Sequence, residues 1–243
     1  MKIILKHKAE FQKLLADYAP ATDAQEILSK IPLVIFMGVS GSGRNTIINH
    51  LVETGKYKFV VSDTTRPPKV RDGALEENAV HYYFRSEEDV LADLNAGKFL
   101  EAELIHNQQI SGISIRELVE VSKSGKIPIN EVEFGGALNI LKIKPDAKIF
   151  FVVPPSYSEW MRRLTAREQM STEELHNRIR TAIKVIQIGL KEDRLTFVIN
   201  DSSLESAEMV DHLVRGGEAE EHHNEARQIA KGILEDIRKH YDV

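Results

Sequence analysis

Apolar residues in this chain fall into short blocks that are separated by longer stretches with helical spacing. The blocks occupy residues 33–37, 58–61, 148–153 and 196–199. Strands that alternate with helices along a chain are typical of a parallel sheet covered by helices. The pattern therefore predicts an α/β fold, with a parallel sheet core flanked by helices.

Several helix ends are marked by the sequence. Two serines stand three residues before a glutamate, which is the spacing of a capping box: Ser156 before Glu159, and Ser171 before Glu174. We expect helices to begin at both places. We also expect Gly97 and Gly125 to end the helices that precede them.

Both ends of the chain carry helical patterns outside this alternation. Residues 1–31 predict two short helices that break at Pro20, with Asp23 as the cap of the second. From Glu218 onward, apolar side chains recur every four residues. This tail is predicted to be a terminal amphipathic helix, hinged at Gly216 and Gly217.

Composition limits the partners and the compartment. The 243 residues, 42% of them hydrophobic, can form one sizeable core. Lysine and arginine total 32 against 37 acidic residues, and the net charge of -5 favours neither nucleic acid nor an anionic membrane as a partner. The absence of cysteine excludes disulfides and thiolate metal sites. Because neither a signal peptide nor a run of about 20 apolar residues is found, we expect a cytoplasmic protein.

The segment GVSGSGRNT, residues 38–46, has the outline of a phosphate-binding loop. LVIFM precedes it and IINHLV follows it, so the loop joins a predicted strand to a predicted helix. Backbone N–H groups of such a loop, together with the helix N-terminus, form a cradle for phosphate. The alternative is a glycine-rich turn without a ligand. We predict an ATP site made of Gly38, Ser40, Gly41, Ser42, Gly43, Arg44, Asn45 and Thr46.

Two residues of this loop depart from the usual pattern. Arg44 stands where lysine normally reaches the β and γ phosphates, and its wider guanidinium keeps the charge but changes its position. Asn45 stands where a serine or threonine hydroxyl normally contacts Mg²⁺. Its amide oxygen can serve as a ligand, as can the hydroxyl of Thr46. We expect a slower reaction than a lysine would support.

A second cationic segment, SDTTRPPKVRD, occupies residues 62–72 directly after a predicted strand. Arg66 and Lys69 lie three residues apart in a stretch stiffened by prolines, with hydroxyl groups beside them. This arrangement suits a phosphate monoester dianion. The alternative is a solvated basic loop, but a phosphate loop in the same chain favours a second phosphate site.

These segments together resemble the guanylate kinases, which transfer the γ-phosphoryl group of ATP to GMP. The family signature TTR-x-x-[KR]-x-x-[DE] is matched at residues 64–72, and HYYF at residues 81–84 is similar to the family's DY-x-F. The similarity extends over roughly residues 34–214. It includes the stretches KFLEAEL (98–104), NEVEFGGA (130–137), VVPPSYSEWMRRLTAR (152–167), HNRI (176–179) and FVIND (197–201).

The resemblance implies the P-loop nucleoside monophosphate kinase fold, with NMP-binding and lid insertions. The core would comprise residues 32–61, 122–156 and 195–215. The NMP-binding segment would be residues 62–121, and the lid would be residues 157–194. Residues 1–31 and 216–243 would then be helical extensions.

The resemblance also implies roles for individual residues. The GMP-binding residues would be Ser62, Arg66, Lys69, Tyr82, Glu101, Glu131, Glu133 and Arg178. Arg167 and Asn200 would join the loop in binding ATP. The catalytic residues would be Arg44, Arg163, Arg167 and Arg178. Mg²⁺, the implied cofactor, would be held by Asn45 and, through water, by Glu131.

The chemistry of Glu101 agrees with its implied role in reading guanine. Guanine presents N1–H and a 2-amino group as adjacent donors, and a carboxylate is an acceptor-only group that can take both. Adenine, an acceptor at N1, would be repelled. Without the resemblance, Glu101 would be interpreted as an ordinary exposed acid on a helix.

Some positions depart from the family pattern. Ser111 stands where the family has a phosphate-binding tyrosine, and Ile113 where it has a hydroxyl residue, so we predict weaker affinity for GMP. Glu131 and Glu133 are each one methylene longer than the family's aspartates. His222 and His223 are predicted to be solvent-exposed polar residues and not a metal site, because neighbouring side chains on a helix point about 100° apart.

The sequence therefore leaves three alternative functions. The leading hypothesis is an ATP-dependent GMP kinase. The second is a catalytically inactive guanylate-kinase-like module that binds a phosphorylated partner through the segment from Ser62 to Lys69. The third is a kinase of the same fold that acts on another phosphate acceptor, such as a sugar phosphate. Glu101 would have no purpose in the third.

Overall fold

The computed structural model describes residues 4–71, 73–166 and 170–241, and within these the chain divides into two compact units. Unit 1 comprises Met1–Leu33, Lys58–Asn130 and Gly135–Ala147. Unit 2 comprises Val34–Tyr57, Glu131–Phe134 and Lys148–Val243.

Three parallel strands form the centre of unit 2. Their order is β11 (Thr196–Ile199), β10 (Lys148–Val153) and β1 (Val34–Gly38). Phe36 pairs with Phe150 and Phe151 pairs with Phe197, so aromatic rings lie against each other across the sheet, with centroids 5.7 and 4.6 Å apart. All four rings are buried. The parallel sheet core predicted from the apolar blocks is confirmed.

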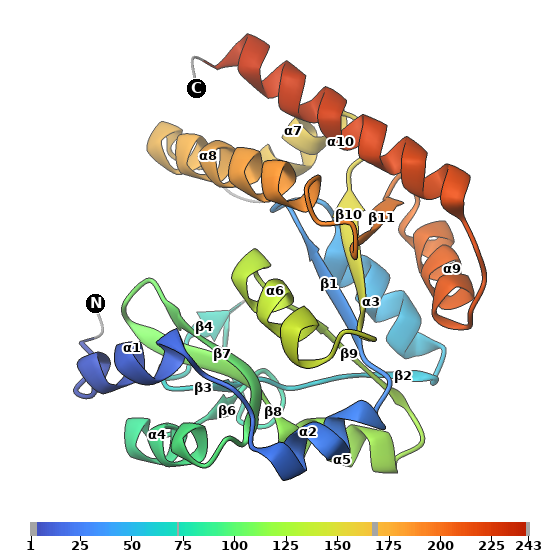
Figure 1. Ribbon diagram of the computed structural model, residues 1–243. Helices are drawn as coiled ribbons and strands as arrows, with labels where there is room; N and C mark the ends of the chain where they lie inside the picture. The colour runs from blue at the N-terminus through green and yellow to red at the C-terminus, as the bar shows by residue number, and fades with distance from the viewer. Residues whose placement is uncertain (1–3, 72, 167–169, 242–243) are drawn as a thin grey trace. The chain divides into compact units, whose positions relative to one another are not determined.

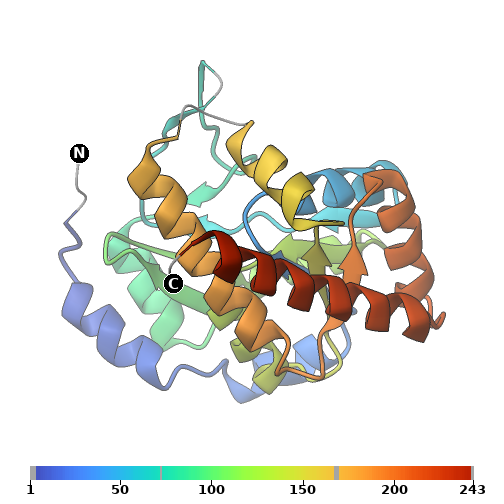
Figure 2. The same cartoon turned by 90° about the horizontal axis from the view of Figure 1, so that it is seen from above.

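Helices cover this sheet. They are α3 (Arg44–Glu53), α7 (Tyr157–Thr165), α8 (Thr172–Gly189), α9 (Ser203–Val214) and α10 (Glu220–His240). α3 packs on β1 and α9, whereas α10 packs on β10, β11, α7 and α8 (Figure 1). Figure 2 shows α10, in dark red, crossing α8. The amphipathic tail is confirmed, since Ile233 and Ile237 of α10 are buried.

Unit 1 contains a four-stranded mixed sheet. Its order is β6 (Tyr83–Phe84), β3 (Asp63–Thr64), β8 (Gln109–Ser114) and β7 (Phe99–Ile105). β3 runs parallel to β6 and antiparallel to β8, and β7 is antiparallel to β8. Unit 1 also contains a two-stranded hairpin, β4 (Val70–Arg71) with β5 (Ala74–Leu75). In the four-stranded sheet, β7 is an edge strand.

The helices of unit 1 include the two predicted near the N-terminus. They are α1 (Lys8–Ala16), α2 (Thr22–Ser29), α4 (Glu87–Asn95), α5 (Ile115–Lys123) and α6 (Phe134–Ile143). α1 packs on β7 and α4, and α2 packs on α5. A buried cluster joins α1, α4, β7 and β8. We call it the Phe99 cluster, and its members are Phe11, Val90, Leu94, Phe99, Ala102 and Ile110.

Two further strands contain residues of both units, namely β2 (Tyr57–Phe59) and β9 (Ile127–Glu131). The blocks predicted at residues 148–153 and 196–199 match β10 and β11, whereas the other two predictions miss their strand ends by one or two residues. Strand ends carry weak sequence signals.

The predicted helix ends are largely confirmed. Ser156 and Ser171 accept hydrogen bonds from the backbone N–H groups three residues later, at 3.1 and 3.2 Å. Gly97 and Gly125 follow the ends of α4 and α5 with φ of 64° and 73°. The prediction for Asp23 is wrong. α2 begins at Thr22, so Asp23 lies inside its first turn, where its carboxylate accepts from the N–H of Ala24.

Candidate functional site

The loop at residues 38–46 has the conformation that a phosphate cradle requires. It leaves the end of β1 and enters α3, whose N-cap is Gly43. Gly41 and Gly43 have φ of 83° and 88°, in the left-handed region that favours glycine. A Cβ on Gly43 would lie 2.2 Å from the side-chain nitrogen of Asn200. The loop therefore presents backbone N–H groups and a helix N-terminus in the way expected from the sequence.

Two side chains fix the backbone of this loop. The Asn200 side-chain nitrogen donates to the carbonyl of Ser42 at 2.7 Å, and the Trp160 ring nitrogen donates to the carbonyl of Ser40 at 2.8 Å. Asn200 was predicted at the ATP site, and the structure places it against the loop. Trp160 was not predicted. The available signal was that it is the chain's single tryptophan, in a capped helix of the predicted lid.

The structure brings Arg44, Asn45 and Glu131 together. Glu131 ends β9, and its Oε2 lies 3.5 Å from Nε of Arg44. In the orientation that satisfies both groups, the amide nitrogen of Asn45 donates to the two Glu131 oxygens at 3.0 and 2.9 Å. Thr46 is exposed beside them, and Glu133 is exposed in the connection before α6. Within the described part of the chain, no group of three or more acidic or histidine side chains is arranged to hold a metal.

Two of the three predicted lid arginines lie near the loop. Nη1 of Arg178 is 3.4 Å from the Ser40 hydroxyl. Arg163 donates from Nη1 to the carbonyl of Asn200 at 2.8 Å and from Nε to Glu159 at 2.6 Å. Arg167 lies outside the described residues. A cavity of about 300 Å³ adjoins the loop, lined by Gly41, Gly43, Thr46, Arg162, Arg163, Ala166, Asn200, Asp201 and Ser203.

In unit 1, Arg66 forms a buried ion pair that was not predicted from sequence. Its Nη1 and Nη2 donate to the two oxygens of Glu76 at 2.5 and 2.9 Å. Glu76 also accepts from the backbone N–H of Lys69, and these bonds lower the pKa of Glu76 to about 2. The Arg66 guanidinium lies 4.7 Å from the ring centroid of Tyr82. Arg66 is thus held rigidly, whereas the Lys69 side chain is exposed.

Glu101 lies in β7 and is only 6% exposed. The interpretation of this residue as an exposed helical acid is therefore wrong. Burial raises its pKa to about 8, with a further increase from the charge of Glu103 and an opposing contribution from a hydrogen bond with the Ile113 backbone. A Cβ on Gly112, in the neighbouring strand, would lie 2.5 Å from the Glu101 carbonyl oxygen. The close packing of β7 and β8 helps keep this carboxyl group out of water.

The remaining predicted acceptor-site residue, Ser62, is half-buried after β2. Its hydroxyl is 3.3 Å from the side-chain nitrogen of Asn130. Ser111, which replaces the family's tyrosine, lies 2.9 Å from the hydroxyl of Thr64. The short serine side chain is thus engaged with the sheet itself.

The two adjacent histidines of α10 are not wet surface, which corrects the prediction made for them. Nε2 of His222 accepts from the N–H of Ile199 at 3.2 Å, and Nδ1 of His223 accepts from the N–H of Phe197 at 3.1 Å. Both donors belong to β11, the edge strand of its sheet. The imidazoles satisfy groups that an edge strand would otherwise present to solvent. Burial lowers the pKa of both rings, which agrees with neutral acceptors.

The sequence profile of the guanylate kinases matches residues 30–215, which is more than half of the chain. The chain belongs to the guanylate kinase family. The guanylate kinase of Sulfurimonas denitrificans is 32% identical over 177 residues, which cover 72% of this chain and 82% of that protein.

Two further comparisons show how much of the chain is similar to other guanylate kinases. Guanylate kinase 1 of Arabidopsis thaliana is 32% identical over 174 residues, which cover 71% of this chain but only 44% of that protein, so the chain spans less than half of this plant relative. The crystal structure of the guanylate kinase from Anaplasma phagocytophilum shares the fold, with a TM-score of 0.56 and 21% identity over 77% of this chain and 86% of that one. The family match leaves out α1, α2 and α10.

Proposed function

We propose that this guanylate kinase family member is an ATP:GMP phosphotransferase, which transfers the γ-phosphoryl group of ATP to GMP and forms ADP and GDP. The buried carboxyl group of Glu101 carries the proposal. An acid in a buried strand destabilises the fold, so its presence calls for a function. Guanine supplies two adjacent donors, N1–H and the 2-amino group, which suit this acceptor-only group when it is ionised. ATP and GMP are thus the proposed partners, and a cytosolic location stays a prediction.

The donor nucleotide is proposed to bind at the loop of unit 2. Its backbone N–H groups and the start of α3 would hold the β and γ phosphates, with Arg44 as the cation beside them. Support comes from the anchoring of the loop by Trp160 and Asn200, because a preorganised cradle loses little entropy when phosphate binds. Asn200 and Arg163 also line the adjoining cavity.

Mg²⁺ commonly binds through one or two side-chain oxygens together with phosphates and waters. Asn45 and Glu131 lie in contact through a hydrogen bond from the amide nitrogen to the carboxylate, so rotation of the amide would offer its oxygen to an ion beside Glu131. Asn45, and Glu131 through water, would hold an ion whose chemistry is to neutralise charge on the transferring phosphoryl group. Thr46, the next residue in α3, carries a further hydroxyl oxygen and lines the cavity beside the loop.

The acceptor phosphate is proposed to bind at Arg66, Lys69 and Tyr82. Glu76 fixes the direction of the Arg66 guanidinium, so this cation is in place before the ligand arrives. Ser62 and Glu101 would contact the base, and Glu133 is proposed for the ribose side of the site. Ser111 cannot reach as far as the tyrosine it replaces, which supports the prediction of a raised KM for GMP.

Transfer requires that donor and acceptor be held in line, with cations over the oxygens where charge develops. We assign that role to Arg178, Arg163 and Arg167 of the predicted lid (residues 157–194). The approach of Arg178 to Ser40 in the loop supports its assignment. Closure of the predicted NMP-binding segment (residues 62–121) and of the lid over the core would exclude water from the reacting groups.

The proposal is tested by mixing the purified full chain with ATP, Mg²⁺ and one acceptor at a time, and measuring ADP. We expect ADP with GMP, much less with AMP, and none with ribose 5-phosphate. Turnover with the sugar phosphate alone would favour a kinase of another acceptor. No ADP with any acceptor, combined with binding of a phosphopeptide, would favour an inactive binding module. Glu101→Gln serves as the matched control, because its side chain keeps the size of glutamate but cannot ionise.

A further inference from the structure

The segment between α1 and α2 is attached to the strand that carries Glu101, although it lies outside the family match. Phe11 of α1 is fully buried in the Phe99 cluster. Beyond α1, the N–H of Ala21 donates to the carbonyl of Gly97 at 3.1 Å, and a Cβ on Gly97 would lie 2.3 Å from the Ala21 nitrogen. The chain therefore runs in close contact with the turn that leads into β7.

Tyr18, in this segment, holds both backbone groups of one β7 residue. Its hydroxyl accepts from the N–H of Phe99 at 2.8 Å and donates to the carbonyl of Phe99 at 2.9 Å. β7 is an edge strand, so these groups point away from its partner β8. The phenol thus takes the place of a neighbouring strand at Phe99. Burial raises the pKa of Tyr18 to about 12, so the hydroxyl stays protonated and able to donate.

Phe99 lies at an irregularity in β7. It pairs with Ser114, and the next pair is Glu101 with Ile113, so two steps along β7 match one step along β8. Leu100 is the extra residue of a β-bulge, which redirects the side chains that follow it. The bulge explains how Phe99 and Ala102, three residues apart, both enter the Phe99 cluster.

The bulge also determines where Glu101 points. Successive side chains in a strand alternate between faces, so Glu101 lies on the face opposite Ala102 and the Phe99 cluster. A shift of one residue in the pairing would exchange the two faces and turn Glu101 toward the apolar cluster. The conformation at Phe99 therefore controls the direction of the carboxyl group.

We infer that Tyr18 is a positioning residue for Glu101: by holding both backbone groups of Phe99, it fixes the bulge that directs Glu101, and so sets the affinity and selectivity for guanine. This inference rests on the proposed function. It assigns a role in substrate selection to a segment outside the family match.

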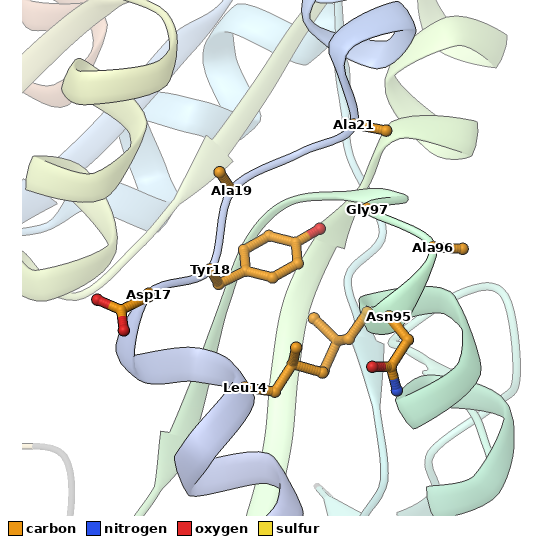
Figure 3. A pocket seen from close by; sticks show the side chains of 9 residues that line it. Leu14, Asp17, Tyr18, Ala19, Ala21, Asn95, Ala96 and Gly97 are labelled. Atoms are coloured by element: carbon orange, nitrogen blue, oxygen red, sulfur yellow. The ribbon is translucent and has the colours of Figure 1, made fainter.

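The surroundings of Tyr18 make a clean variant feasible. Figure 3 shows the Tyr18 ring beside an open cavity, with its hydroxyl directed toward the segment of Gly97. The cavity measures about 300 Å³, and Leu14, Asp17 and Asn95 are among its lining residues. In Tyr18→Phe the ring keeps its packing, and water from this cavity can reach the two released backbone groups. We therefore expect the variant to fold.

The test compares Tyr18→Phe with Tyr57→Phe. Tyr57 is also a buried tyrosine with a hydrogen-bonded hydroxyl, donated to Asp211 at 2.9 Å, but it lies in unit 2. For each protein, the measured quantities are kcat, the KM values for ATP and GMP, and the ratio of kcat/KM for GMP to that for IMP, which lacks the 2-amino group. We expect Tyr18→Phe to raise the KM for GMP about tenfold and to lower the GMP to IMP ratio by a similar factor, with kcat and the KM for ATP within about twofold.

The control, Tyr57→Phe, should leave all these quantities within about twofold of wild type. Equal KM values for GMP and equal GMP to IMP ratios in Tyr18→Phe and wild type would overturn the inference, as would equal losses in the two variants. A direct measurement separates it from the proposed function. The carboxyl ¹³C resonance of Glu101 is titrated in wild type and Tyr18→Phe without nucleotide. A changed titration supports positioning even if wild type forms no ADP, and an unchanged titration refutes it.

Discussion

The raised pKa of Glu101 predicts an unusual pH dependence for the binding of GMP. The carboxyl group must be ionised to accept from N1–H and the 2-amino group together, yet burial holds its pKa at about 8 in the free protein. Under the proposed function, GMP would therefore bind a minor ionisation state at neutral pH. Raising the pH populates the binding state, and the KM for GMP should fall.

The size of this effect follows from the pKa. At pH 7 roughly one carboxyl group in ten is ionised, and at pH 9 roughly nine in ten, so the KM for GMP should fall nearly tenfold over this interval. The phosphate of GMP adds little, because its second pKa is about 6. Loss of the guanine N1 proton toward pH 9 opposes the effect, and the Glu101→Gln control reports it separately. The shift also acts on stability. The folded state retains a proton that the unfolded state loses near 4.5, so the contribution of Glu101 to folding becomes less favourable as the pH rises from 4.5 toward 8.

The assay measures initial rates of ADP formation at pH 7, 8 and 9, with ATP saturating and GMP varied. Glu101→Gln is the control, because its side chain does not titrate and any slope it shows belongs to the nucleotide or to other groups. At pH 9 this variant should have a KM at least about tenfold above that of wild type, since it loses a charge-assisted pair of hydrogen bonds. A KM that stays constant in wild type, or that changes equally in both proteins, would refute the reasoning.

Three further predictions concern the loop and α10. Arg44→Ala should lower kcat by about a hundredfold or more while Arg44→Lys retains or raises it, because a cation is needed beside the transferring phosphoryl group; equal rates in all three proteins would count against this. Gly43→Ala should raise the KM for ATP at least about tenfold, because the added Cβ would displace Asn200. Gly55 also has a positive φ, of 75°, but no described atom lies within 4 Å of an added Cβ. Gly55→Ala should therefore lower the free energy of unfolding in urea by only about 1 kcal/mol. Stability in urea should also fall as the pH drops below 6.5, because the lowered pKa values of His222 and His223 make the unfolded state bind more protons. The double variant with Gln at both positions should lose much of this fall, and an unchanged fall would contradict the assignment.

Local signals predicted the features that depend on neighbouring residues. The loop conformation follows from glycines between a strand and a helix, and the caps at Ser156 and Ser171 follow from contacts three residues apart. For this reason the conformation of the loop and several helix ends were predicted correctly, whereas phosphate binding by the loop stays a prediction. The prediction for Asp23 failed because the N-cap is Ala21, two residues earlier, and sequence carries little information at that scale.

Features that depend on tertiary packing could not be predicted. The pairing of Arg66 with Glu76 requires a hairpin to return the chain, and a second acid, Glu77, stands next to the partner in sequence. The burial of Glu101 depends on β8 and on the bulge at Phe99, for which the sequence shows no marker. Likewise, the role of His222 depends on an edge strand that is more than twenty residues away. In each case the decisive partner is distant in the chain.

We propose that this chain phosphorylates GMP and selects guanine through Glu101. The most direct measurement incubates wild type and Glu101→Gln at pH 9 with Mg²⁺, γ-labelled ATP and a mixture of equal amounts of GMP and AMP, and quantifies the labelled diphosphates. We predict labelled GDP in large excess over labelled ADP for wild type, and a sharply reduced excess for the variant. Absence of labelled GDP in wild type, or the same excess in both proteins, would contradict the claim.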